Sequence, residues 1–355
     1  MHHHRTGSRP GRTAGVTRRG PGWPGLVAVI PAVGAGVIYL APRSVGTTWT
    51  QVAAALASVD PRWWPALAVV WLAGLRAYAV VMSASLPGLT GGRAIGLNLA
   101  GSAVANTVPL GGAASLGLTT AMMRSWGFRP MAVTSFLLLT NLCNVASRLL
   151  LGLIATGLVL GIVVSNDRAL TRAGRAGGAI ARLLPARSRA ERSRQPELDP
   201  PPDPQPGRPP ERDPGQVLLA LRGRIGTTMR TAWAPLTLGS CGSLLLLAVL
   251  LELCLRGLGV TASVPLVIAA VGIERLATAL PITPGGAGTA ELALVACLSA
   301  SGVPPADALA ATILYRFFTF FLEIPLGAAI GLAWYLRRHR RPLRPAGLRP
   351  IRRAW

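Results

Sequence analysis

The chain has 355 residues, of which 51% are hydrophobic and only 14% are charged, and its mean hydropathy is +0.46. Its formal charge of +23 would suit nucleic-acid binding in a soluble protein. Here, however, the 36 basic residues are all arginines, and they crowd into the two tails and one linker. The positive-inside rule explains this distribution in a membrane protein. Several apolar runs reach the roughly 20 residues needed to cross a bilayer. We therefore predict an all-α polytopic protein of the cell membrane with about seven to eight hydrophobic helices, and we exclude nucleic acid as a partner.

Five segments of different composition follow one another along the chain. Residues 1–22 are rich in Arg, Gly and Pro and predict a disordered basic tail, and residues 337–355 form a second basic tail. Residues 166–233 form an Arg/Pro-rich linker that cannot build a core, with a short basic surface helix predicted near its end. The apolar segments between these stretches predict two membrane units, 23–165 and 234–336.

The first membrane unit contains one helix more than the second. In the first unit we expect helices over about 23–41, 63–86 and 94–107, then a short helix up to Arg124 and a long apolar run over 131–164. In the second unit we expect helices over about 234–255, 264–280, 287–300 and 306–336. The run over 131–164 would be about 51 Å long as a helix, which exceeds a membrane span, so we expect it to tilt or to divide near Asn141–Arg148.

Each unit contains a segment of prolines and glycines that should interrupt a membrane helix. The first is Pro109-Leu110-Gly111-Gly112, and the second runs from Pro281-Ile282-Thr283-Pro284-Gly285-Gly286 to Ala287-Gly288-Thr289-Ala290-Glu291. Broken backbone inside a bilayer is tolerated only where protein or a water-filled cavity satisfies the freed groups. A polar break followed by a carboxylate therefore predicts a binding site, although a kink needed only for packing is the alternative. The candidate residues at the two breaks are Pro109, Gly111, Thr283, Pro284, Gly285, Gly286, Gly288 and Glu291.

The two units align without a gap as an internal repeat. Pro109 and Pro284 lie 284 − 109 = 175 positions apart. The same offset links four further pairs, namely Gly111 with Gly286, Gly127 with Gly302, Pro130 with Pro305 and Gly152 with Gly327. Repeats with Gly/Pro-interrupted segments at corresponding positions indicate the central site of a transporter. A structural duplication without transport remains open as the other interpretation.

The same offset reveals a polar stripe on one helix of each unit. Asn141, Asn144 and Arg148 have spacings of three and four, and so lie on one helix face. Their partners at the offset are Arg316, Thr319 and Glu323. Polar groups on one face are costly against lipid, so we expect both faces to look inward. Arg148 and Glu323 have opposite charge at equivalent positions, which makes their pairing plausible.

A further pair of charged residues breaks the symmetry between the units. Glu274 and Arg275 have no charged counterparts in the first unit, where Leu99 and Ala100 stand. Any function of this pair is therefore confined to the second unit.

The membrane topology is left open by the sequence. Basic tails on the same side require an even number of crossings, whereas one helix plus two identical units gives an odd number.

No residue pattern indicates a catalytic centre, a metal site or a cofactor. The four cysteines lie in apolar segments without a Cys-x-x-Cys spacing, and they are interpreted as packing residues. Apart from the run at residues 2–4, His339 is the only histidine. We therefore expect no enzymatic activity.

The two interrupted segments resemble signatures of a known family. Pro281-x-x-Pro284-Gly285-Gly286-x-Gly288-x-x-Glu291, with Gly302-Val303 and Tyr315-Arg316 after it, resembles the C-terminal signature of the lysylphosphatidylglycerol synthase transmembrane-region family, also described as flippase-like. Asn106-x-x-Pro109-x-Gly111-Gly112, followed by Trp126-Gly127, is similar to the N-terminal signature. The resemblance covers roughly residues 24–336, and it carries Arg316 into the motif together with the proline, glycine and glutamate positions. Residues 110–123 lack the charges that many relatives carry after the first proline.

The resemblance implies movement of a lipid between leaflets or service to a lipid-linked glycan pathway. Aminoacylated phosphatidylglycerol and polyprenyl-linked sugars are the implied cargoes. In the multiple peptide resistance factor of this family, a soluble aminoacyl-transfer domain follows the membrane part. Because the present chain stops soon after its last helix, we expect no synthase activity.

Three hypotheses follow for the function. In the first, a phospholipid or lipid-linked headgroup crosses the bilayer between the repeats, with phosphate bound by the amides of residues 285–288 and by Arg316 and Arg148. Glu291 would then receive a cationic headgroup or a coupling proton, or would simply cap its helix. In the second, the protein is a non-transporting partner of a soluble glycosyltransferase or other transferase. In the third, it is a membrane enzyme that acts on lipid headgroups.

Overall fold

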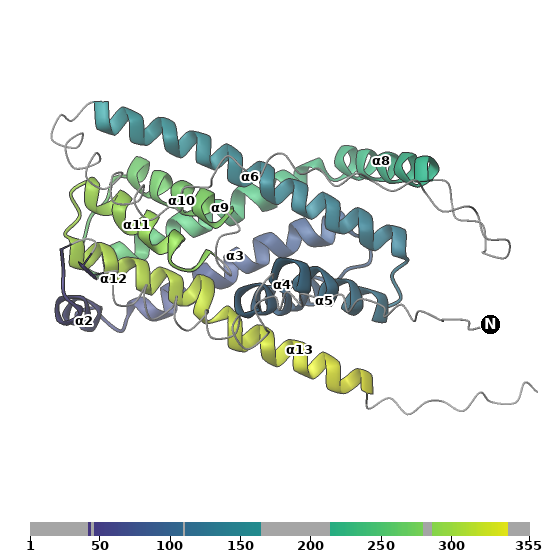
Figure 1. The fold of residues 1–355 in the computed structure, drawn as a ribbon, viewed down its shortest axis with the longest axis horizontal. Coiled ribbons are helices and arrows are strands. Elements are labelled where there is room, and N and C mark those ends of the chain that lie inside the picture. The colour runs from purple at the N-terminus through teal and green to yellow at the C-terminus, as the bar shows by residue number, and fades with distance from the viewer. Residues whose placement is uncertain (1–41, 44–45, 109–110, 165–213, 280–285, 340–355) are drawn as a thin grey trace, which may run out of the picture.

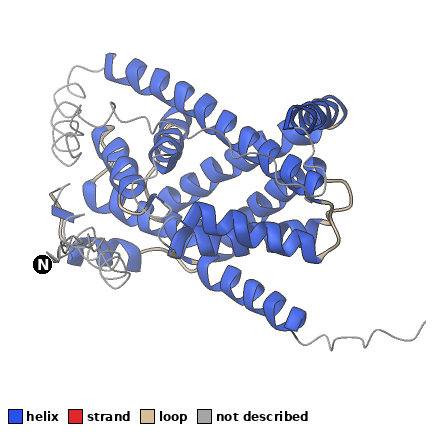
Figure 2. Ribbon diagram, turned by 45° about the vertical axis from the view of Figure 1, so that its right-hand side comes forward, coloured by secondary structure: helices blue, strands red, loops and turns tan. Residues whose placement is uncertain are grey.

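The computed structural model describes residues 42–43, 46–108, 111–164, 214–279 and 286–339. The predicted tail 1–22, the extra N-terminal helix near 23–41 and most of the linker and C-terminal tail lie outside these residues. The part of the chain that is described contains helices and loops but no strand (Figures 1 and 2). Its helices are α2 (Trp49–Ala57), α3 (Trp63–Ser85), α4 (Gly91–Thr107), α5 (Gly111–Ser125), α6 (Pro130–Val164), α8 (Pro214–Thr231), α9 (Trp233–Gly257), α10 (Val264–Ala279), α11 (Thr289–Ala300), α12 (Pro305–Arg316), the π-helical turn η3 (Phe317–Phe321) and α13 (Glu323–His339).

Four helices are long and apolar enough to cross a membrane. They are α3, the portion Pro130–Leu158 of α6, α9, and the continuous helix Pro305–His339 made of α12, η3 and α13. The prediction of an all-α polytopic membrane protein is thus confirmed. Of the two alternatives for 131–164, division is wrong, because α6 is one unbroken helix of 35 residues, and the tilt stays a prediction. Without proline or glycine near Asn141–Arg148, nothing interrupts its backbone hydrogen bonds there.

The long helices keep the 175-residue correspondence over their whole length. A shift of 175 carries α6, Pro130–Val164, onto residues 305–339, which are the bounds of the α12–η3–α13 helix. The two helices differ in one respect: only the second contains a π-helical turn. The extra residue in such a turn changes the faces on which flanking residues lie, and π-turns are frequent at functional sites.

The equivalent helices α3 and α9 run antiparallel to each other. Gly239 lies against Ala77 and Val81, whereas Gly257, at the other end of α9, lies against Trp63. Gly74 faces Leu246 between these two contacts. Because equivalent helices point in opposite directions, the two repeats are inverted with respect to each other, which is the arrangement of many secondary transporters.

Each repeat also packs its long helix against a short helix of the other repeat. A Cβ atom on Gly327 of α13 would lie 2.0 Å from the carbonyl oxygen of Leu99 in α4. Gly152 of α6 is the equivalent residue, and a Cβ atom there would lie 2.4 Å from the side chain of Leu276 in α10. These two glycines allow the closest approach of the helices, so the repeats interlock at two matching crossings.

Two hairpins of short helices lie between the long ones. In the first, α4 and α5 are antiparallel, with Gly101 near Ser115 and Gly111 against the backbone of Ala105. In the second, Gly286 lies against Thr278 as the chain turns from α10 toward α11. The longest of these helices has 17 residues, or about 25 Å, which is less than the ~30 Å hydrocarbon core. The helices of the two hairpins are therefore not among the four candidate spans.

The helix α2 was not expected from the sequence. Thr48 caps its N-terminus, because its hydroxyl accepts from the amide of Gln51 while the Gln51 side chain accepts from the amide of Thr48. This reciprocal capping box is a Thr-x-x-Gln pattern that the sequence displays. Other bounds differ from the predictions by only a few residues.

Candidate functional site

The second interrupted segment separates α10 from α11. The helix α10 ends at Ala279 and α11 begins at Thr289. Gly286 and Gly288 have φ angles of +70° and +87°, which lie in the left-handed region that favours glycine. The helix break is therefore built from glycines, as the sequence predicts. Of the candidate residues at the two breaks, Thr283, Pro284, Gly285 and Pro109 lie outside the described part of the chain, and Gly111 is the first residue of α5.

Glu291 holds the start of α11 and binds an arginine at the same time. One carboxylate oxygen accepts a hydrogen bond from the amide of Gly288 at 2.6 Å. The other accepts from Nε of Arg316 at 2.7 Å. A carboxylate in the first helical turn is favoured by the helix dipole. The capping alternative and the charge-binding alternative for Glu291 therefore describe two contacts of one side chain.

Arg316 is almost completely buried at the end of α12. Its side chain is only 3% exposed and lies between two carboxylates, with Nη1 3.6 Å from Glu274 in addition to the contact with Glu291. Its guanidinium carbon lies 4.5 Å from the ring centroid of Phe320, within cation–π range. Arg316 thus joins α10, α11 and the π-turn.

Glu274 and Arg275 extend this group along α10. Glu274 is fully buried, and both of its oxygens accept from the guanidinium of Arg275, in the fork-to-fork arrangement typical of strong arginine–carboxylate pairs. The same carboxylate also faces Arg316. The asymmetric pair singled out in the sequence therefore belongs to the same charged group as Arg316 and Glu291.

Glu323 connects the site to the first hairpin. Its carboxylate accepts a 2.5 Å hydrogen bond from the hydroxyl of Ser102 in α4. Asn106, one residue before the end of α4, donates to that same hydroxyl at 3.3 Å. Glu323 also interacts electrostatically with Arg275 and Arg316. The α12–η3–α13 helix therefore contacts both hairpins, the second through Arg316 and the first through Glu323.

The polar stripe of α6 contributes unequally to this group. Arg148 interacts electrostatically with Glu274 and Arg275, and its Nε donates to Asn144 at 3.0 Å. Asn141 is exposed and donates to the carbonyl of Leu137 in its own helix, so the expectation that it faces inward is wrong. Among the described ion pairs there is none between Arg148 and Glu323, because each finds a nearer partner on a short helix or on its own helix.

The assembled group contains equal numbers of positive and negative side chains. Three carboxylates and three guanidinium groups belong to it, namely Glu274, Glu291, Glu323, Arg148, Arg275 and Arg316. Desolvating a charge costs several kcal/mol per ion, and a buried pair is weak evidence of added stability. This balanced cluster at the centre of a long membrane helix is therefore the candidate functional site.

A comparison with protein-family models identifies the family of the chain. Residues 26–327 match the family described as the lysylphosphatidylglycerol synthase TM region. The chain belongs to this family. The matched range includes most of both inverted repeats and all six charged residues of the cluster. Searches of curated proteins and of solved structures found no match.

Several residues at the site of this lysylphosphatidylglycerol synthase TM-region protein were not singled out from the sequence as site residues. Ser102 gave no signal by itself, although its neighbour Asn106 belongs to the first signature. Tyr315 is fully buried beside Arg316, and its hydroxyl has no hydrogen-bond partner. The indole of Trp71 is buried beside the cluster and interacts with the carboxylate of Glu323. An unpaired polar group is costly to bury, so the hydroxyl of Tyr315 is available to a bound polar group.

Proposed function

We propose that the protein moves a phospholipid or lipid-linked headgroup between the two leaflets, without chemistry of its own. The observation that carries this proposal is the charge-balanced cluster between two inverted repeats, reached by the tips of both hairpins. Inverted repeats supply two related arrangements around one site, and transporters use such pairs for alternating access. A headgroup at the cluster would leave its acyl chains in the surrounding lipid.

The contacts of Glu291 indicate how a phosphate would bind. The amide of Gly288 and the guanidinium of Arg316 form an anion-binding pair of donors, and both are directed at one carboxylate. A headgroup phosphate offers the same acceptor oxygens and suits a helix N-terminus. In this proposal the phosphate displaces Glu291, and the released carboxylate accepts a cationic or hydroxyl group of the same headgroup. A headgroup with both phosphate and amine would preserve the charge balance of the cluster.

Transfer of labelled lipid in reconstituted vesicles tests this proposal. Fluorescent or isotopically labelled phosphatidylglycerol and its aminoacylated form are incorporated, and the fraction reaching the other leaflet is measured. We expect Glu291→Gln and Arg316→Gln to slow transfer by at least about tenfold, since each removes one charge-assisted contact. Glu252→Gln is the matched control. The Glu252 side chain is 19% exposed, like that of Glu291, and pairs with Arg256 at 2.6 Å, but it lies outside the cluster.

The result also separates the alternative functions. Equal transfer by wild type and by the cluster variants would overturn the proposal. Absence of transfer by the wild type, together with co-purification of a soluble transferase, would favour the partner function. Among the described residues no three His, Cys, Asp or Glu side chains form a group that could hold a metal ion. Release of a product from labelled lipid by the purified protein would favour the headgroup enzyme.

A further inference from the structure

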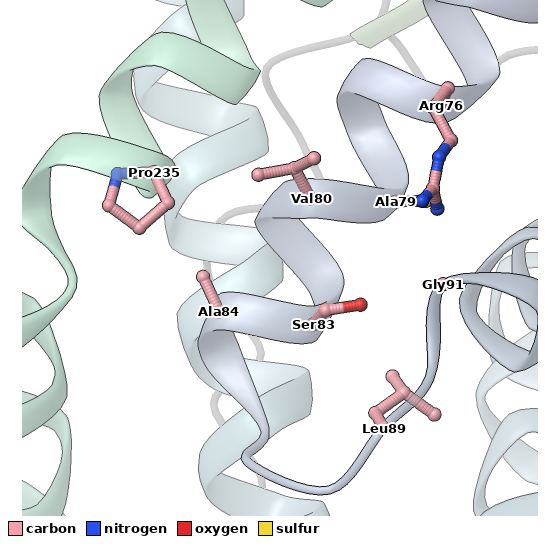
Figure 3. Close-up of a pocket in the computed structure, with 8 residues that line it drawn as sticks. All are labelled: Arg76, Ala79, Val80, Ser83, Ala84, Leu89, Gly91 and Pro235. Atoms are coloured by element: carbon pink, nitrogen blue, oxygen red, sulfur yellow. The ribbon is translucent and has the colours of Figure 1, made fainter.

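A cavity of about 430 Å³ lies between α3, the turn that leads into α4, and the start of α9. Its walls are largely apolar and include Val80, Ala84 and Leu89. Three residues bring polar character to it: Arg76, Ser83 and the backbone of Gly91 (Figure 3). It shares no residue with the charged cluster around Arg316, so it is a separate feature of the fold.

Arg76 differs from the arginines of the cluster because it has no partner. It occupies position 14 of the 23 residues of α3, yet among the described residues it makes no hydrogen bond or ion pair. Arg76 is exposed, so its guanidinium has donors that are open to a ligand. Figure 3 shows its guanidinium directed toward Gly91, at the mouth of the turn.

Ser83 presents a second unpaired polar group on the same side of the helix. Its hydroxyl oxygen is buried and has no hydrogen-bond partner. By contrast Ser85, two residues later, donates to the carbonyl of Val81 at 2.7 Å, which is how serines in these helices are usually satisfied. Arg76 and Ser83 are seven residues apart, or about 10 Å along the helix. A group with several acceptor oxygens could therefore receive hydrogen bonds from both.

Gly91 keeps the space in front of the guanidinium open. A Cβ atom on Gly91 would lie 2.0 Å from Nη1 of Arg76, whereas a Cβ atom on the adjacent Gly92 would have no neighbour within 4 Å. A side chain at position 91 would therefore displace the guanidinium from its place in the cavity, whereas one at position 92 would not.

We infer that this cavity binds a phosphate group, and that the phosphate is the diester of an anionic phospholipid. Arg76 and Ser83 supply donors that match phosphate oxygens, and a guanidinium is well suited to phosphate. The apolar walls suit the glycerol and the first carbons of acyl chains, which free phosphate lacks. The inference does not depend on translocation, because it concerns a second binding site away from the cluster.

Equilibrium binding to the purified full chain in detergent tests this site. The probes are dioctanoyl phosphatidylglycerol, dioctanoylglycerol (which lacks the phosphate) and inorganic phosphate. We expect phosphatidylglycerol to bind with a Kd that rises about tenfold or more in Arg76→Gln and also in Gly91→Ala. Arg129→Gln and Gly92→Ala serve as matched controls, and we expect their Kd to stay within about twofold of the wild-type value. Arg129 is an exposed arginine outside the cavity.

The outcomes distinguish the sources of the phosphate and the alternatives to it. Inorganic phosphate that binds with the same dependence on Arg76 would support the site and make free phosphate a ligand. Equal binding of dioctanoylglycerol, or a Kd that is unchanged in both Arg76→Gln and Gly91→Ala, would overturn the inference. Glu291→Gln should leave this Kd unchanged even where it abolishes lipid transfer, so failure of the cluster mechanism would be recognised separately.

Discussion

Gly152 and Gly327 stand at equivalent positions of the two repeats, and each lies where a long helix crosses a short helix of the other repeat. The two crossings differ in what a side chain would meet. At Gly327 the neighbour is the carbonyl oxygen of Leu99, which belongs to the backbone and cannot move aside. At Gly152 the neighbour is the side chain of Leu276, which can change rotamer.

Gly327→Ala should therefore destabilise the protein. A methyl group 2.0 Å from a carbonyl oxygen forces the helices apart, at a cost of about 1–3 kcal/mol. The measurement is the thermal unfolding temperature of the purified protein in detergent. Gly331→Ala, one turn later in α13, is the control, because its nearest neighbour would be 4.0 Å away. That change should be neutral or slightly stabilising, since alanine is the better helix former, and an equal loss in both variants would contradict the crossing.

Cysteine cross-linking should detect the antiparallel contact of α3 and α9. A Cβ atom at position 74 would lie 3.8 Å from Cβ of Leu246, close to the mean for disulfides. With the four native cysteines replaced, Gly74→Cys/Leu246→Cys should form a disulfide on mild oxidation. Its formation is measured as a mass decrease or as a mobility shift that reduction reverses.

A second pair makes this test specific for direction. A Cβ atom at position 242 would lie 3.9 Å from Cβ of Ala77, so Ala77→Cys/Gly242→Cys should also cross-link. Ala77→Cys/Val249→Cys should not, because Val249 is seven residues from Gly242, or about 10 Å along α9, and would face Ala77 only if the two helices were parallel. Cross-linking of Ala77→Cys/Val249→Cys but not of Ala77→Cys/Gly242→Cys would show that the inverted arrangement is wrong.

The ion pair between Glu291 and Arg316 should show a large coupling energy. A double-mutant cycle of Glu291→Gln and Arg316→Gln should give about 1–3 kcal/mol, since the arginine is buried and the contact joins two charged groups. The reference is the Glu252–Arg256 pair, which has a similar distance of 2.6 Å but an arginine that is 59% exposed. That cycle should give less than about 1 kcal/mol. Chemical unfolding in detergent measures both, and equal couplings would contradict the buried geometry.

The distribution of arginines indicates the orientation in the membrane. Trp334 donates to Ser125, and Arg93 lies over Trp126, so the start of α4 and the ends of α5 and α13 meet at one end of the molecule. The basic residues of this end are Arg93, Arg124, Arg129, Arg337 and Arg338. At the opposite end Figure 1 shows α2 and the start of α12. The charged residues near these two elements include Asp60, Arg62 and Asp307, so the charges there are mixed. By the positive-inside rule the first end should face the cytoplasm.

Labelling with a membrane-impermeant maleimide checks this orientation. In a chain without native cysteines, Ser58→Cys should react in intact cells, because Ser58 is exposed at the end next to α2. Arg129→Cys should react only after the cells are made permeable. The reverse pattern would place the basic end outside.

The features visible in the sequence were those set by local chemistry and by the repeat. The helix breaks follow from prolines and glycines, and Glu274, Glu291, Arg316 and Glu323 attract attention as charges in apolar runs, so their positions could be predicted. Their partners could not. Ser102 is 221 positions from Glu323, and no periodicity connects them.

Two other features escaped the sequence because they depend on tertiary packing. The π-turn at Phe317–Phe321 lies in a helix whose sequence counterpart, α6, is regular. The cavity beside Arg76 required the close approach of Gly91, which only the fold provides. The expectation that Asn141 faces inward was wrong for a related reason. In the 35-residue helix α6 this exposed side chain hydrogen-bonds to the backbone of its own helix and needs no partner on another one.

The two oxygens of Glu291 give the site a mechanical property. One oxygen fixes the first amide of α11 and the other fixes Arg316, so a guest that takes the arginine also loosens the beginning of the helix. A group bound at the cluster would therefore change the flexibility of the second hairpin. In the proposed function, a single carboxylate would therefore couple headgroup binding at Arg316 to the stability of the first turn of α11.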